Sequence, residues 1–207
     1  MGKTVARSLA TSGKTNAAVR HPGAAMGRTL LMVSLLSMAA LASSAGANNG
    51  GGGGAEAKLQ DRSGNPVGKL TITAHENGAV AVQVRVHDLP PGFHGFHVHA
   101  VGECTAPFTS AGGHFDKDKH THGSHSGDLP VLQINENGTG KATIHTDRFS
   151  IDDLFDSDGS AIIVHANPDN YANIPTRYAA APDAATLSTG DSGDRIACGV
   201  IERTAKQ

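Results

Sequence analysis

Histidines are concentrated in one stretch of this chain in a way that predicts a metal site. Seven of the twelve histidines in the 207-residue sequence lie between His94 and His125. Imidazole nitrogens are common ligands of copper and zinc, so such a dense group of histidines points to metal chemistry.

The spacing of the first histidines assigns each to one face of a strand. His97 and His99 are separated by one residue, so both side chains leave the same face. Phe96 and Val98 have the opposite parity, and we expect them to face the core. His94 shares that core parity, so we interpret it as a hydrogen-bonded structural histidine, with metal ligation as the less favoured alternative.

Residues 1–47 have the composition of an export signal. They contain five basic and no acidic residues, and an apolar run at 30–42 is followed by small residues at 43–47. The apolar run is too short to span a bilayer comfortably and argues against the alternative, a transit peptide. Met26 is a second candidate start. We therefore expect a protein exported to a periplasm, a cell envelope or the medium.

The rest of the chain is acidic. Residues 48–207 retain twelve of the seventeen Lys and Arg residues and all nineteen Asp and Glu residues, so the net charge is 12 − 19 = −7. This charge disfavours nucleic acid as a partner. Residues 48–55 are glycine-rich and predict a flexible linker, and one domain is expected over residues 56–207.

The domain alternates apolar and polar residues with a period of two, which predicts strands. Strands are expected at 70–74, 80–86, 131–134, 141–145, 161–165 and 196–201, with Asn-Gly turns at 76–78 and 135–138. No long helical periodicity appears after residue 55. Short strands joined by such turns predict an antiparallel sandwich or barrel.

Two long polar connections interrupt this pattern, at residues 100–127 and 166–194. In a compact β domain, connections of this length are usually functional. The first contains most of the later histidines. Four histidines lie outside the motifs and are interpreted as ordinary surface or core residues: His21, His75, His87 and His145.

Five short motifs occur in a characteristic order over residues 56–201: Gly95–His99 (GFHVH), Ala111–Phe115 (AGGHF), His125–Asp128 (HSGD), Ile162–His165 (IIVH) and Asp194–Ile201 (DRIACGVI). Together they resemble the secreted copper-zinc superoxide dismutases. The resemblance implies an all-β fold, an eight-stranded antiparallel Greek-key sandwich or barrel with two long functional loops. It also implies an enzyme that converts superoxide to oxygen and hydrogen peroxide.

The resemblance implies a role for each residue at a matching position. The implied copper ligands are His97, His99, His114 and His165, and the implied zinc ligands are His114, His122, His125 and Asp128. Asp169 matches a carboxylate that links histidines of the two metal sites, Thr189 a hydroxyl that narrows the channel, and Arg195 a catalytic cation beside copper. Cys104 and Cys198 match a disulfide that joins the first long loop to the last strand.

The zinc-binding stretch departs from the family pattern. His125 follows His122 after only three residues, closer than the family places them, and His120 is an alternative to His122 as a ligand. Residues three apart in a turn can still share one metal ion. We therefore expect a zinc site that is occupied but weaker than in the family. The alternative is that the shortened loop cannot bring His122 and His125 around one ion, which would leave the site without zinc and His114 as an ordinary copper ligand.

Two other functions are compatible with these motifs. One is a secreted copper- or zinc-binding protein, or a copper-delivery protein, on the same fold but without turnover. The other is an adhesion-type sandwich in which the histidines are incidental. The enzyme is favoured because the implied copper ligands and Arg195 are all present. The sequence does not decide the oligomeric state, and a homodimer is one alternative.

Overall fold

The computed structural model describes residues 53–205. The predicted export signal and residues 48–52 of the predicted linker lie outside this range. The first strand begins at Ala55, one residue before the predicted start of the domain. No helix within residues 53–205 is long and apolar enough to cross a membrane.

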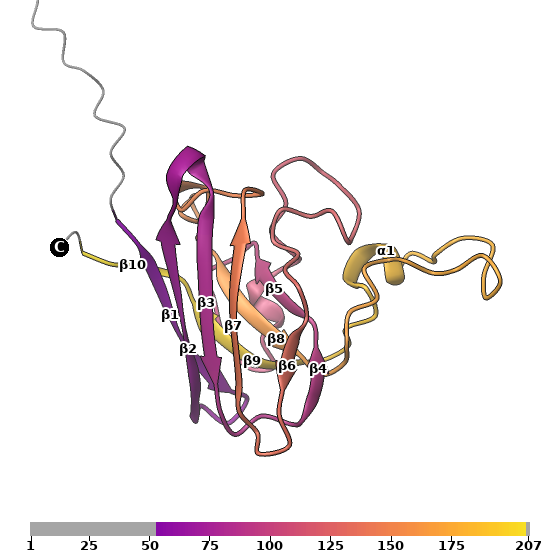
Figure 1. The fold of residues 1–207 in the computed structure, drawn as a ribbon, viewed down its shortest axis with the longest axis horizontal. Coiled ribbons are helices and arrows are strands. Elements are labelled where there is room, and N and C mark those ends of the chain that lie inside the picture. The colour runs from indigo at the N-terminus through magenta and orange to yellow at the C-terminus, as the bar shows by residue number, and fades with distance from the viewer. Residues whose placement is uncertain (1–52, 206–207) are drawn as a thin grey trace, which may run out of the picture. The chain divides into compact units, whose positions relative to one another are not determined.

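All ten strands of the described chain belong to one antiparallel sheet (Figure 1). The strands are β1 (Ala55–Asp61), β2 (Pro66–Ala74), β3 (Val80–Val86), β4 (Gly92–His94), β5 (Phe96–His99), β6 (Leu132–Ile134), β7 (Gly140–Thr146), β8 (Ala161–His165), β9 (Arg195–Val200) and β10 (Glu202–Arg203). Within residues 53–205 the helical segments are η1 (Glu76–Gly78), η2 (Thr109–Ala111), η3 (Asp152–Leu154) and α1 (Thr186–Thr189).

The hairpin of β2 and β3 follows the predicted alternation. Val82 pairs with Ile72 and Val84 with Leu70, and all four side chains are buried in the core. The turn between the strands contains Asn77 and Gly78, which adopt φ values of 62° and 79°. A tight hairpin turn requires such positive φ values, and Asn-Gly supplies them at low cost.

The sheet curls so that its two edge strands, β4 and β5, are joined directly by the chain. The strand order is β4-β6-β7-β3-β2-β1-β9-β8-β5, with β10 beside β1. The terminal strands β4 and β5 are consecutive pieces of chain separated by Gly95 alone, so the sheet forms a nearly closed barrel. Eight strands were predicted. The ten observed strands agree with this number if β4 and β5 count as one strand and the two-residue β10 as an extension of β9.

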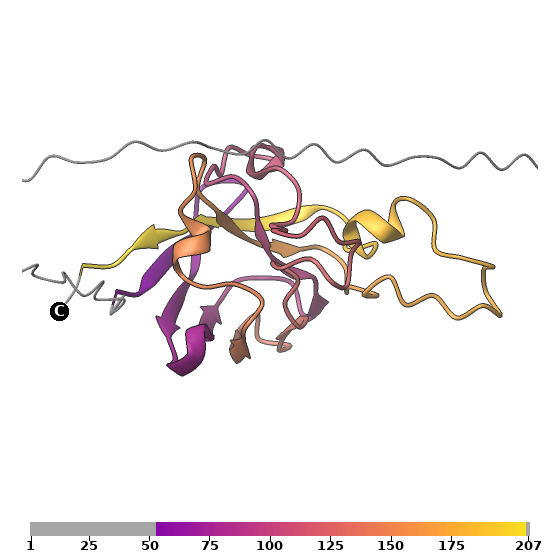
Figure 2. The ribbon, with the colours of Figure 1, turned by 90° about the horizontal axis from the view of Figure 1, so that it is seen from above.

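Both long connections are fixed to the barrel close to the histidines. His99 forms an isolated bridge with His114, and His97 forms one with Asp128, so the first connection returns along β5. The predicted disulfide is present: Cys104 is bonded to Cys198 of β9. The second connection carries α1, and its part between β8 and α1 extends farther from the barrel than α1 does (Figures 1 and 2).

Candidate metal centre

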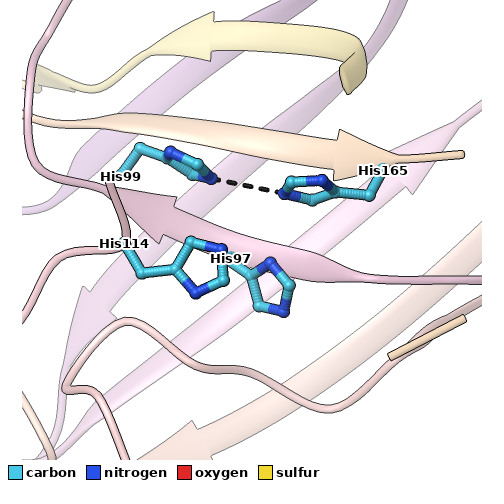
Figure 3. Close-up of side chains that lie close together, drawn as sticks. All are labelled: His97, His99, His114 and His165. Carbon is cyan, nitrogen blue, oxygen red and sulfur yellow. Dashed lines mark hydrogen bonds between the residues drawn. The ribbon is translucent and has the colours of Figure 1, made fainter. Parts of the chain in front are cut away.

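Four histidines from three parts of the chain converge at one end of β5. His97 and His99 lie on β5, His165 ends β8, and His114 lies in the first long connection. One ring nitrogen of each lies within 4.8 Å of those of the others, and Figure 3 shows the four rings close together. Nε2 of His99 is 3.3 Å from Nε2 of His165. We call these residues the four-histidine cluster.

The rings of this cluster are held in the uncharged form that binds metals. Burial, reinforced by neighbouring positive charge, lowers the pKa of His114 to about 4 and that of His165 to about 3. The same causes hold the pKa of His99 well below its ordinary value. At neutral pH the nitrogen lone pairs are therefore available to a metal ion.

His114 also belongs to a second group, which we call the mixed cluster: His114, His122, His125 and Asp128. Oδ1 of Asp128 lies 2.9 Å from Nδ1 of His114 and 3.3 Å from Nδ1 of His125. Nδ1 of His122 lies 3.2 Å from Nδ1 of His114. The short spacing between His122 and His125 thus brings both rings to one point.

The turn that carries these ligands is closed by Asp128 itself. Oδ2 of Asp128 accepts hydrogen bonds from the backbone amides of Gly123 at 2.7 Å and His125 at 3.0 Å. This leaves Oδ1 facing the rings. His120, the alternative ligand, lies outside the cluster: its ring is exposed and lies 3.2 Å from Asp116.

The geometry of both clusters fits metal ions. In a tetrahedral site with bonds of about 2.0–2.1 Å, neighbouring ligand atoms lie about 3.3 Å apart. The observed separations of 2.9–3.3 Å are close to this value. In addition, the buried atoms His97 Nδ1 and His114 Nε2 have no hydrogen-bond partner among the described residues, and such orphaned polar atoms are rare.

Asp169 joins the two clusters. Its two oxygens accept hydrogen bonds of 2.7 Å from Nε2 of His97 and Nε2 of His122. Burial raises the pKa of Asp169, but the hydrogen bonds from His122 and His97 outweigh burial and hold it well below the ordinary range. The pKa of Asp128 is lowered in the same way, by hydrogen bonds from His114 and His122.

His122 lies between these two carboxylates. Burial alone would lower its pKa, but hydrogen bonds to Asp128 and Asp169 raise the pKa to about 9. The ring is therefore positively charged at neutral pH when no metal is bound. A divalent cation in the mixed cluster would replace the proton on Nδ1 as the partner of Asp128, while Nε2 would keep its proton and its hydrogen bond to Asp169.

A guanidinium group is fixed beside the four-histidine cluster. Arg195, the first residue of β9, donates from Nη1 to the carbonyl of Phe108 at 2.5 Å and from Nη2 to the carbonyl of Gly112 at 2.6 Å. The Gly112 carbonyl also lies 3.0 Å from Nδ1 of His99. The charge of Arg195 is close enough to contribute to the lowered pKa of His99. The site thus combines two metal-ligand sets with one oriented cation.

Known proteins resemble this chain in sequence and in fold. A family model described as copper/zinc superoxide dismutase (SODC) matches residues 67–201. This chain belongs to the copper/zinc superoxide dismutase family. The Cu-Zn superoxide dismutase of Photobacterium leiognathi is 33% identical over 156 residues, which cover 68% of this chain and 82% of that protein.

Other members of the superoxide dismutase family are also similar. The Cu-Zn superoxide dismutase of Mycolicibacterium paratuberculosis is 47% identical over 130 residues, or 55% of this chain. The match spans only 57% of that relative's length. Among solved structures, a double mutant of a SOD-like protein from Bacillus subtilis has a TM-score of 0.58 and 31% identity, covering 70% of this chain and 94% of that one.

Besides His120, two more of the residues singled out from the sequence lie away from the clusters' ligand atoms: His94 and Thr189. Nδ1 of His94 lies 2.7 Å from the carbonyl oxygen of His165, and Nε2 lies 2.9 Å from the carbonyl oxygen of Pro90. These contacts confirm a structural role for His94. The hydroxyl of Thr189, matched in the superoxide dismutases to a channel residue, donates to the carbonyl of Ala185 within the α1 turn and is exposed. A channel contact for Thr189 stays a prediction.

Sequence reasoning missed residues that support Arg195 and Asp169. Nε of Arg62 donates to the backbone carbonyl of Arg195 at 2.7 Å, and the same guanidinium pairs with Asp194. Gly190 packs directly on the Asp169–His122 hydrogen bond at a φ of +59°, and a Cβ there would collide with both side chains. No sequence pattern links Arg62 to Arg195, because 133 positions separate them.

Proposed function

We propose that this chain is a superoxide dismutase that uses copper for catalysis and zinc as a structural ion. The observation that carries this proposal is the pair of metal-ligand clusters that share His114, with Arg195 fixed beside the four-histidine cluster. Its family membership supports the same activity.

We assign copper to the four-histidine cluster and zinc to the mixed cluster. Neutral imidazoles suit copper in both of its oxidation states, whereas the carboxylate of Asp128 favours zinc. Asp169 and the Gly112 carbonyl hold the outer nitrogens of His97 and His99, which fixes the orientation of these rings. The fit of the mixed cluster supports an occupied zinc site despite its short ligand spacing.

The residues of the site have separate tasks in the reaction. Copper, when bound, supplies the one-electron chemistry by which one superoxide is oxidised to oxygen and a second is reduced and protonated to hydrogen peroxide. Arg195 attracts the anion locally, which matters because residues 48–207 carry a net charge of −7. The unpartnered Nε2 of His114 can take up a proton and give it back at that atom.

The principal alternative is a copper- or zinc-binding protein without turnover. The oriented Arg195 argues against it, because metal storage needs no cation beside the metal. The two functions are separated by loading the protein with both ions and measuring its visible copper absorption together with its inhibition of superoxide-driven dye reduction. Copper absorption without inhibition would favour the binding protein.

We further propose that the chain is exported. The composition of residues 1–47 and the disulfide between Cys104 and Cys198 both support this, because disulfides persist mainly in oxidising compartments. Fractionation of the producing cells, followed by N-terminal sequencing of the protein, tests it. A homodimer stays a prediction, which sedimentation of the purified protein would check.

A further inference from the structure

His75 and His145 form a pair of histidines outside the two clusters. His75 follows the end of β2, and His145 lies on β7, with β3 between these strands (Figure 1). Their ring centroids are 5.1 Å apart and the rings are nearly perpendicular, at 79°. From the sequence both were expected to be ordinary residues, because neither belongs to a motif.

The residue between them allows the rings to approach. Ala81 of β3 pairs with His145 on one side and with Thr73, two residues before His75, on the other. By parity Ala81 belongs to the outer face, like the exposed Gln83, yet it is only 3% exposed. Its small side chain is therefore covered by neighbouring groups, and the register places it between the strand positions that carry the two histidines.

The spacing of the two rings suits a shared metal ion. A ring bound through a bond of about 2.0–2.1 Å has its centre about 3.1 Å from the metal, so two rings at right or tetrahedral angles lie about 4.4–5.1 Å apart. Ring pairs within the four-histidine and mixed clusters are separated by 4.1–6.5 Å. The separation of His75 and His145 falls within both ranges.

The ring nitrogens of this pair are available. Within residues 53–205, no hydrogen bond engages a ring nitrogen of either residue, whereas the exposed His87 is bound to Asp88 at 2.8 Å. His145 also borders a surface hollow of about 280 Å³, which gives water access to its ring. Water can thus complete the coordination of a metal that two imidazoles hold.

We propose that His75 and His145 bind one divalent transition-metal cation as a third, surface metal site. Two imidazoles with open positions suit Cu²⁺ and Zn²⁺, and the general order of affinities places Cu²⁺ first. Neither of the two proposed ligands, His75 and His145, belongs to the four-histidine cluster or the mixed cluster.

Titration of protein already loaded with copper and zinc tests this proposal. After gel filtration, Cu²⁺ is added at neutral pH and followed by electron paramagnetic resonance and calorimetry. The wild type should bind one further Cu²⁺ per chain with a nitrogen-ligated signal. His75→Ala and His145→Ala should each weaken this binding by about tenfold or more, because the second imidazole acts at high effective concentration.

Two further variants make the test specific. His87→Ala removes an exposed histidine from the other end of β3 and should leave the additional Cu²⁺ bound as in the wild type. Ala81→Leu retains both imidazoles but fills the space beneath them, and should weaken binding. The proposal is overturned if no further Cu²⁺ binds, or if only one of the two histidine substitutions weakens the binding. Unchanged zinc and copper content of the two clusters in all variants shows that the fold is intact.

Discussion

Replacing Asp169 by asparagine should weaken zinc binding more than copper binding. The carboxylate accepts two hydrogen bonds of 2.7 Å, from His97 and His122, and all three side chains are fully buried. Asparagine offers one acceptor and one donor, so one of the two ring N–H groups would face an N–H group. The loss of one charge-assisted hydrogen bond costs about 1.5–3 kcal/mol, roughly ten- to a hundredfold in metal affinity.

The loss should fall mainly on zinc because the two histidines are held differently. His97 lies on β5, which is paired with β8, so the strand fixes its position without Asp169. His122 lies in the long connection, where its backbone amide donates to Leu187 and Asp169 holds the far nitrogen of its ring. The amide of the variant is therefore expected to satisfy His97 and leave His122 misoriented.

Competition with a chromophoric chelator measures the dissociation constant of each ion in Asp169→Asn. Asp152→Asn is the matched control. Asp152 is an exposed carboxylate that pairs with Arg203 and belongs to neither cluster. The control should retain wild-type affinities. A zinc dissociation constant within twofold of wild type in Asp169→Asn would refute the idea that this carboxylate orients His122.

Arg195→Glu should slow superoxide removal strongly while copper stays bound. The difference in rate from wild type should shrink as salt is added, because salt screens the local attraction of the anion. Equal rates for the variant and the wild type at low salt would contradict this role. Replacing both cysteines by alanine should lower the free energy of unfolding by roughly 4–5 kcal/mol, since the disulfide spans 94 positions, and denaturant unfolding of the oxidised and variant proteins measures it. Metal-free protein should be most stable near pH 6.5. His114 and His165 have lowered pKa values of about 4 and about 3, so their stabilisation is complete above the ordinary value of 6.5 and is lost as the pH falls below it. The pKa of His122 is raised to about 9, so its contribution to the free energy of unfolding is complete below pH 6.5 and is lost as the pH rises through 9. A free energy of unfolding that rises steadily from pH 5 to pH 9 in urea titrations would count against this assignment.

Much of the fold and site could be predicted because the relevant signals are local. The alternation of Val80, Val82 and Val84 specifies a strand with one buried face, and the Asn-Gly turn before it specifies the hairpin. The spacing of His97 and His99 places both imidazoles on one face of β5, which the structure confirms. Such patterns reflect the geometry of a single segment of chain.

Features that depend on strand pairing could not be predicted in this way. His75 and His145 looked unremarkable because their proximity depends on the order β2-β3-β7 and on the register that places Ala81 between them. The contact of Arg62 with Arg195 likewise depends on β1 lying beside β9. The sequence also offered both His120 and His122 as the remaining zinc ligand, because only two positions separate them. The tertiary structure places His122, and not His120, in the mixed cluster.

The central claim is tested most directly by following the decay of superoxide itself. Superoxide absorbance is recorded in stopped flow with protein loaded with copper and zinc, alongside His165→Ala treated identically. The account predicts catalysed decay for the wild type and only background decay for the variant, which lacks one ligand of the four-histidine cluster. Copper-loaded wild-type protein that leaves the decay at its background rate would contradict it.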